Sequence, residues 1–388
     1  MKFSIKKYLL YSSIFAIFTE AFFFKFIIDW KLLYLIIIVN YFLLLKLKKI
    51  TFNKYFVYLI FGLFIHALIV NSFIGVPPNF MLAQIIGISI IGTYYYNFIP
   101  LFDKNEIITV YAKMSLYVAA IGYPLYFLDI NVNDGRLQSI FKEPAHFVVV
   151  VLPACYYYLK TKKYIPFSII FGALILSNSS LGYIGCGLMF LLPNLSYRRI
   201  FYFVGILPVI IGLFYYVYTE YPFFKMRIDD TYSSINAVNS GVFKEEANLS
   251  TYAILSNIFV AKSNISDHPF GSGIGSHIYM HKSRYLHRIR TPEYLVTQNL
   301  QAINSTDANS MFTRILSELG ILGFFLVIYL LHFAAKSYNS NELYFAQGVV
   351  IYVLLKLFRD GHYFAPEFYF FIWLLYYYLV DYLKKTKD

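Results

Sequence analysis

Apolar runs fill most of this sequence, and a single long polar stretch, from Glu220 to Ser310, interrupts them. The chain is 59% hydrophobic and 14% charged, whereas a soluble domain has roughly 25% charged residues. Several runs reach the ~20 residues that a helix needs to cross a bilayer. Backbone amides in lipid must be satisfied within the segment itself. The sequence therefore predicts an all-α, polytopic membrane protein.

About twelve membrane-spanning helices are predicted from these runs, near residues 7–25, 32–45, 55–74, 80–98, 107–128, 144–159, 164–177, 182–193, 200–218, 311–334, 343–358 and 368–382. Three regions follow: helices in 1–218, a large loop in 219–310, and helices in 311–388. The seventh and eighth spans are short, which favours broken helices around Ser177–Gly182. Within the large loop, the pattern of residues 242–262 predicts an amphipathic helix.

The basic residues indicate which side of the membrane each loop occupies. With the N-terminus in the cytoplasm, the inner loops hold most of the lysines and arginines, among them Lys46, Lys48, Lys49, Lys160, Lys162, Lys163, Arg198 and Arg199. This asymmetry fits the positive-inside rule, from which loops longer than about 60 residues are exempt. Both termini are therefore expected in the cytoplasm and the polar stretch outside. The net charge of +12 then reflects topology, and no nucleic-acid partner is expected.

The first polar cluster is the segment RLQSIFKEPAHF, which begins at Arg136. Pro144 suits the first turn of a helix, which places Glu143 at the helix mouth and His146 one turn further on nearly the same face. A carboxylate is stabilised as the anion at this end of a helix. A capping glutamate beside an interfacial histidine is one interpretation. A catalytic or binding role is the other, favoured by the presence of four ionisable groups in a chain poor in polar residues.

The second cluster opens the tenth predicted span, in STDANSMFTRILSELGILGF. Arg314 and Glu318 lie four residues apart and share one helix face. Ionisable groups at membrane depth usually line a cavity or pair with each other. An internal Arg314–Glu318 pair is therefore one interpretation. In the other, Arg314 faces an anionic substrate group, with Asp307 and Asn309 at the helix mouth.

The third cluster is HPFGSGIGSH, from His268 to His277, with three glycines at alternate positions. Glycine-rich backbone allows amides to approach an anion closely, as in phosphate-binding loops. Gly273 lies at the centre of the segment. The segment lacks the strand and second half of a dinucleotide-binding motif, and a plain turn is an equal alternative.

The fourth cluster, HKSRYLHRIR, is rich in bases and ends with Arg288 and Arg290. A run of charge is most often a solvated face. Above a membrane, anionic lipid headgroups or pyrophosphate would be its natural partners. Metal binding is disfavoured, because the eight histidines show no HExxH or comparable ligand spacing.

The fifth cluster is KLFRDGHYFAPE, between the last two predicted spans. Arg359, Asp360 and His362 are expected to face outward, and Pro366 repeats the proline at a helix start. A tight interfacial hairpin is the alternative to a functional role. The outward segments hold no GxSxG, P-loop or DxD-type site. An external enzyme of this kind would need a pre-activated donor carried by a lipid, because nucleotides are scarce outside the cytoplasm.

HPFGSGIGSH, followed by DANSMFTRILSELGILGF at the start of a span, resembles the O-antigen ligase and O-antigen polymerase superfamily. Members carry a comparable glycine-rich segment late in a large periplasmic loop, then an Asn-centred motif and an E-x-G-I-x-G run. The EPAHF segment and the SNSSLG break also match the family's layout. The resemblance extends from about residue 107 to the end. Many ligases carry Arg where this chain has Leu181 and His where it has Ala308, so the resemblance favours the Wzy-type polymerases.

This resemblance implies a GT-C-like fold in the bacterial inner membrane with a periplasmic active site. The substrates would be oligosaccharide repeat units on undecaprenyl pyrophosphate. A growing glycan would be transferred to the non-reducing end of a new unit, with inversion at the anomeric carbon and without metal or other cofactor. A flippase and a chain-length regulator would be expected partners, besides membrane lipids.

Such a reaction needs a base for the acceptor hydroxyl and cations for the departing pyrophosphate. Glu143 is the first candidate base and Asp307 the second. The candidate cations for the pyrophosphate are Arg136, Arg288, Arg290 and Arg314. Further contacts to the pyrophosphate or glycan are expected from His146, His268, Gly273, Asn309 and Arg359.

Three other functions compete with the polymerase. A ligase shares the donor and moves finished glycan to a lipid A core, but its His beside Asn309 is missing. A lipid-linked oligosaccharide flippase or other transporter suits twelve spans. Transporters, however, tend to have internal repeats and mid-membrane charges, and here the polar groups gather at one face. A non-catalytic assembly subunit is the third.

Overall fold

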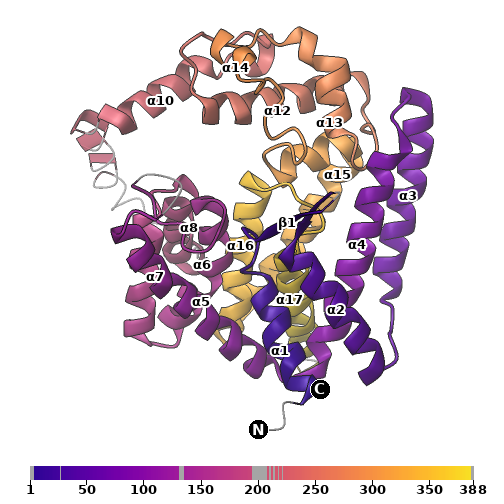
Figure 1. Ribbon diagram of the computed structural model, residues 1–388, viewed down its shortest axis with the longest axis vertical. Helices are drawn as coiled ribbons and strands as arrows, with labels where there is room; N and C mark the ends of the chain where they lie inside the picture. The colour runs from indigo at the N-terminus through magenta and orange to yellow at the C-terminus, as the bar shows by residue number, and fades with distance from the viewer. Residues whose placement is uncertain are drawn as a thin grey trace.

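The computed structural model describes residues 4–385, except for 27, 131–134, 195–207, 209–210, 213–214, 217 and 221. The described residues form sixteen α-helices and one short β-hairpin, so the predicted all-α class is confirmed (Figure 1). The predicted ninth span, 200–218, lies mostly outside the described residues.

Five helices are long and apolar enough to cross a membrane, by their length and composition. They are α3 (Lys54–Ile74), α4 (Pro78–Phe98) with the 3₁₀ turn Ile99–Leu101, α5 (Lys104–Phe127), α15 (Met311–Ala335) with the turn Lys336–Asn339, and α16 (Tyr344–Arg359) with the turn Asn341–Leu343. The shorter apolar helices are α2 (Leu32–Leu47), α7 (Tyr164–Leu176) and α8 (Ser180–Leu191), which continues as the turn Leu192–Asn194. The chain is thus a multi-pass membrane protein.

Helices also lie at the remaining predicted spans of the described residues: α1 (Ile5–Ala16), α6 (Pro144–Lys160) and α17 (Pro366–Lys385). Prolines occupy the first turns of α4, α6 and α17, where a missing amide hydrogen costs nothing. The break between α7 and α8 falls at Ser177–Ser179 as predicted. The number of crossings is not shown, so about twelve stays a prediction.

The first predicted span is wrong beyond its middle. Helix α1 ends at Ala16, and the chain turns and forms the antiparallel hairpin β1 (Phe23–Phe26) and β2 (Ile28–Lys31). The Thr19 hydroxyl donates to the Ala16 carbonyl, a local bond that competes with helix continuation. The turn also carries Glu20 away from the helix axis to a basic partner on α6.

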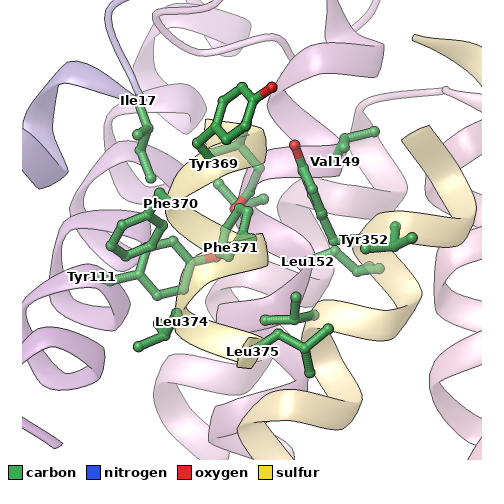
Figure 2. Packing of buried hydrophobic residues seen from close by; sticks show 14 of the residues in the cluster. Ile17, Tyr111, Val149, Leu152, Tyr352, Tyr369, Phe370, Phe371, Leu374 and Leu375 are labelled. Atoms are coloured by element: carbon green, nitrogen blue, oxygen red, sulfur yellow. The ribbon is translucent and has the colours of Figure 1, made fainter. Parts of the chain in front are cut away.

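Helix α16 lies at the centre of the bundle and packs against α6, α8, α15 and α17. Aromatic side chains of α16 and α17 meet those of α5 there (Figure 2). The rings of Tyr352 and Phe371 lie 4.5 Å apart, and those of Tyr111 and Phe371 lie 5.3 Å apart. A tightly packed aromatic core leaves α16 little freedom to shift, so residues at its end are held in fixed positions.

The large loop folds into a helical cap, residues 222–310, with a hydrophobic core of its own. Its helices are α10 (Pro222–Ser234), α11 (Ala237–Ser240), α12 (Leu249–Asp267), α13 (His277–Tyr279) and α14 (Glu293–Thr297), with a π-helical turn at Met280–Tyr285 and a 3₁₀ turn at Leu286–Arg288. The cap core includes Ile74 and Val76 from the end of α3. In Figure 1 the cap lies at the end of the bundle opposite both chain termini.

The predicted amphipathic helix of the cap is α12, but its bounds differ. Residues 242–248 are not helical, and the helix runs to Asp267. Asn248 is the N-cap, and its side chain accepts a hydrogen bond from the Thr251 amide at 2.9 Å. An asparagine at this position satisfies an otherwise orphaned amide, which explains why the helix starts there.

Two glycines allow the cap and α15 to meet backbone to backbone. Gly320 interrupts α15 with φ 57° and ψ −136°, and the following amide, of Ile321, donates to the Pro269 carbonyl at 3.0 Å. A Cβ on Gly320 would lie 2.1 Å from that carbonyl oxygen. A Cβ on Gly271 would lie 2.4 Å from the Glu318 carbonyl oxygen. The glycine-rich segment of the cap and the SELG segment of α15 therefore form one interlocked unit.

Substituting Gly320→Ala should destabilise the protein by roughly 3 kcal/mol or more, because the backbone is strained for any other residue and the added carbon clashes with Pro269. Thermal unfolding in detergent measures the effect. Gly62→Ala is the matched control, because nothing lies within 4 Å of a Cβ on this helical glycine. Equal melting temperatures for the two variants would contradict the interlocked contact.

Candidate functional site

A recess lies between the turn after α1, the start of α6 and the loop that joins α16 to α17. It has about 470 Å³ of empty space, including solvent at its mouth. Ionisable groups line it in an otherwise apolar bundle: Glu20, Lys31, His146, Asp360, His362 and Glu367. Three segments far apart in the sequence thus bring charged side chains to one place.

Glu20 and His146 form the first pair in this recess. The Nδ1 atom of His146 lies 2.6 Å from a carboxylate oxygen of Glu20, and Lys31 Nζ lies 3.6 Å from the other oxygen. Burial alone would raise the pKa of Glu20, but the charges of His146 and Lys31 and the hydrogen bond from His146 outweigh it and lower the pKa to about 2. Glu20 is therefore an anion at neutral pH.

Lys356 holds the α16–α17 loop in place. Its side chain is fully buried, and Nζ lies 2.5 Å from Asp360 Oδ2 and 3.5 Å from Glu367 Oε1. Burial would raise the pKa of Asp360, but the Lys356 ammonium, with His362 and His146, holds it well below its usual range. An ammonium shared by two carboxylates fixes both ends of the loop that carries His362.

Asp307, Asp360 and His362 form the centre of the candidate site. His362 Nε2 lies 4.0 Å from Asp307 Oδ2. The other oxygen of Asp307 accepts from the Asn309 amide at 3.1 Å, and Asp360 Oδ1 accepts from the His362 amide at 3.0 Å. The imidazole is 41% exposed and faces the solvent, and Asp307 is half-buried, at 17%. A histidine oriented by a carboxylate is suited to general-base chemistry.

Among the residues described, Asp307, Asp360 and His362 are the group that could hold a metal ion. One ligand atom from each lies within 4.8 Å of the others. A metal ion at these residues would be repelled by the Lys356 ammonium, which lies 2.5 Å from Asp360 and already neutralises its charge. The electrostatics therefore favour the His362–Asp307 pair as a proton acceptor over the trio as a metal centre.

Arg314 forms an internal ion pair with Glu318, which is one of the two interpretations that the sequence allowed. Arg314 Nε donates to Glu318 Oε1 at 3.0 Å, and Nη1 donates to the Gly361 carbonyl at 2.9 Å. The guanidinium also stacks 4.2 Å from the centre of the Tyr363 ring. The side chains are 2% and 0% exposed. Arg314 thus positions the loop that carries His362, and direct contact with a substrate anion stays a prediction.

The glycine-rich segment does not present bare amides to an external anion. The amides of Gly275 and His277 donate to the Glu318 carboxylate at 2.8 and 3.2 Å, and the Gly273 amide donates to the Glu318 carbonyl at 2.8 Å. All three glycines have positive φ, the conformation that lets successive amides converge on one anion. The anion that this loop cradles is the chain's own Glu318, so a phosphate contact through Gly273 loses its predicted basis.

Three further predicted residues lie near the recess. Glu143 is the exposed N-cap of α6, makes no capping hydrogen bond, and interacts electrostatically with His146. Asn309 is buried, with its Oδ1 atom accepting from Asn304 at 2.8 Å. Arg359 ends α16, directly before Asp360. The structure thus brings Glu143, His146, Asp307, Asn309 and Arg359 to one region.

The other predicted residues lie elsewhere. Arg136 Nε donates to the Ser177 carbonyl at 3.4 Å, at the break between α7 and α8. His268 and Arg288 line a second hollow on the outside of the cap. Arg290 is exposed, and its backbone pairs with Val242. These four residues therefore do not join the Asp307–His362 centre.

One alternative for the basic segment of the cap, a solvated face, does not hold at its first residue. His281 is fully buried, and its ring packs 6.2 Å from that of His277. Burial lowers the pKa of His281 to about 4 and that of His277 well below its usual range. His277 is held by Ser317 Oγ at 2.9 Å and Asn257 Oδ1 at 3.0 Å. Both imidazoles are neutral, and His277 joins the cap to α15 through Ser317.

Neither a scan against protein-family models nor a search of the curated proteins found a match for this chain. The geometry of the site therefore carries the functional argument. Sequence reasoning did not assign Glu20 or Lys31 to the site, and it placed Lys356, His362 and Glu367 in a polar cluster without naming His362 as a candidate base. The available signal was a single charged residue within or beside an apolar run, which is costly in lipid and indicates a partner.

Acidification should weaken the cap, because both histidines must gain a proton on unfolding. A lowered folded-state pKa means that their contribution is complete above the unfolded value of about 6.5 and is lost as the pH falls toward 4, by about 3 kcal/mol for His281. Hydrogen exchange of cap peptides at pH 7.5, 6.0 and 5.0 measures this. His281→Phe should flatten the pH dependence, and His287→Gln, at an exposed position, should not. Equal slopes in all three proteins would refute the explanation.

Proposed function

We propose that this protein is a membrane glycosyltransferase that polymerises oligosaccharide repeat units carried on undecaprenyl pyrophosphate, at the periplasmic face of a bacterial inner membrane. The observation that carries the proposal is the contact between His362, which lines the recess, and Asp307 of the cap, at 4.0 Å. The resemblance of the cap and α15 motifs to O-antigen polymerases supports the choice of substrate class.

The distribution of charge supports a site at one face. The loops that join α1 to α2 and α16 to α17 lie toward the cap and away from the termini (Figure 1), and residues of these loops line the recess. With the basic loops and both termini in the cytoplasm, the cap and the recess lie in the periplasm. A periplasmic site has no supply of nucleotide sugars, so a lipid-borne pyrophosphate donor is the matching substrate.

The proposed reaction is a single displacement at the anomeric carbon of the donor. His362 Nε2 takes the proton of the acceptor hydroxyl, and Asp307 stabilises the imidazolium that forms. The hydroxyl oxygen forms a bond to the anomeric carbon while the bond between that carbon and the pyrophosphate oxygen breaks. The configuration at the anomeric carbon is thereby inverted. The electron pair of the broken bond leaves with the pyrophosphate. Lys31 in the recess and Arg359 beside Asp360 are the cations proposed to stabilise the developing charge.

Glu143 is the second candidate for the base. It is exposed at the mouth of α6 and acts electrostatically on His146, whose own partner is Glu20. Glu143 does not line the recess, whereas His362 lines it and lies beside a carboxylate. The order of candidates is therefore His362 with Asp307 first and Glu143 second.

Asp307→Asn and His362→Gln should each lower polymerisation by roughly 10²- to 10⁴-fold, the usual contribution of a positioned base. In a strain whose surface glycan depends on this gene, each variant should give lipopolysaccharide with only core and a single repeat unit on a gel. Glu246→Gln removes an exposed cap carboxylate and is the control that should keep the full ladder. The ladder of the Glu143→Gln variant tests the second candidate base in the same way.

The same gels separate the competing functions once the membrane level of each variant is matched. A normal ladder in both Asp307→Asn and His362→Gln would rule out the proposed centre. Long chains that form but stay on the lipid carrier in a deletion strain would identify a ligase. Loss of both the ladder and the single-repeat-unit band in the deletion strain would identify a flippase.

A further inference from the structure

We propose that a hollow on the outer side of the cap binds the phosphate headgroup of an anionic membrane phospholipid. The hollow has about 750 Å³ of empty space and lies between the end of α3 and the π-helical turn of the cap. Phe73 and Ile74 line it from below, and Asp267, His268, Arg284 and Arg288 line it from the cap. None of these residues lines the recess that contains His362.

The charge of the hollow suits a phosphate. Two arginines and one aspartate line it, and the polar side chains of Ser283 and His287 add donors. Asp267 is already engaged, because it accepts from the Tyr285 hydroxyl at 3.0 Å and pairs with Arg288 at 3.5 Å. The hollow therefore keeps an excess of positive charge, and guanidinium groups bind phosphate oxygens in a bidentate manner.

The two arginines are positioned by different contacts. Arg284 Nη2 donates to the carbonyl of Ile74, the last residue of α3, at 2.8 Å. Arg288 stacks 5.1 Å from the centre of the Tyr285 ring and remains 49% exposed. Both guanidinium groups thus stand at the level where α3 ends. That level is the membrane interface if α3 spans the hydrocarbon core, and phospholipid phosphates lie there.

The surface below the hollow matches acyl chains. Helix α3 is the least covered of the long apolar helices, with 11% of its central window buried. Phe73 is 86% exposed, and Phe61 and Ile69 on the same helix are 60% and 52% exposed. An apolar helix face that continues upward into a cationic hollow is complementary to one lipid molecule, with its chains along α3 and its phosphate between the arginines. This complementarity favours a lipid over a soluble phosphate.

Native mass spectrometry of the purified protein, with phosphatidylglycerol or phosphatidylcholine added, tests the proposal. The wild-type protein should retain phosphatidylglycerol in clear preference to phosphatidylcholine. Arg284→Gln/Arg288→Gln should weaken this binding roughly 30-fold, about fivefold for each arginine beside an anionic lipid. Arg284→Lys/Arg288→Lys keeps the charge and should retain most of it. Lys225→Gln/Lys244→Gln removes two exposed cap lysines outside the hollow and should change binding less than about twofold.

Three results would overturn the proposal. The first is equal retention of the two lipids by the wild-type protein, which needs no variant to fold. The second is equal weakening by the arginine pair and the lysine pair, because binding would then follow net charge alone. The third is binding of glycerol 3-phosphate or inorganic pyrophosphate as tight as that of phosphatidylglycerol, because the acyl chains would then contribute nothing.

Discussion

One buried carboxylate, that of Glu318, joins the parts of the protein on which the candidate site depends. It accepts from Arg314 on its own helix and from the amides of Gly275 and His277 in the cap. Arg314 in turn donates to the carbonyl of Gly361, next to His362. The cap, α15 and the α16–α17 loop are therefore connected through one ion pair. Removing one partner of such a pair leaves a buried charge without compensation, at a cost of about 3–5 kcal/mol.

The charged side chains around the recess obey the same rule, that a charge removed from water needs a partner of opposite sign. Each buried acid has a base within reach: Glu20 has His146 and Lys31, and Asp360 and Glu367 share Lys356. The His362–Asp307 contact is longer, at 4.0 Å, and its imidazole is 41% exposed, more than any side chain of the close pairs. The close pairs hold the loops in position, and the looser pair is the one left accessible to a substrate. This division distinguishes positioning residues from the proposed catalytic pair.

The sequence predicted what depends on local pattern. Apolar runs located the bundle helices of the described residues, and the i, i+4 spacing of Arg314 and Glu318 allowed their pairing. What it could not predict depends on partners far away in the chain. The end of α1 at Ala16 reflects Glu20 turning toward His146, 126 residues later. The burial of His281 depends on its packing against His277 inside the cap. For the glycine-rich segment the sequence left an anion cradle and a plain turn as equal alternatives, and the anion it holds, Glu318, comes from another helix.

The central claim is that this chain joins lipid-linked oligosaccharides at the recess that His362 lines, with Asp307 beside that histidine. The most direct measurement uses the purified protein in nanodiscs with a single defined repeat unit on undecaprenyl pyrophosphate. Products are then measured by mass spectrometry, without any nucleotide sugar. The account predicts products that lengthen by whole repeat units, with release of undecaprenyl pyrophosphate and inverted linkage, and none with the His362→Gln protein. Unchanged substrate with the wild-type protein, or equal lengthening by the variant, would contradict it.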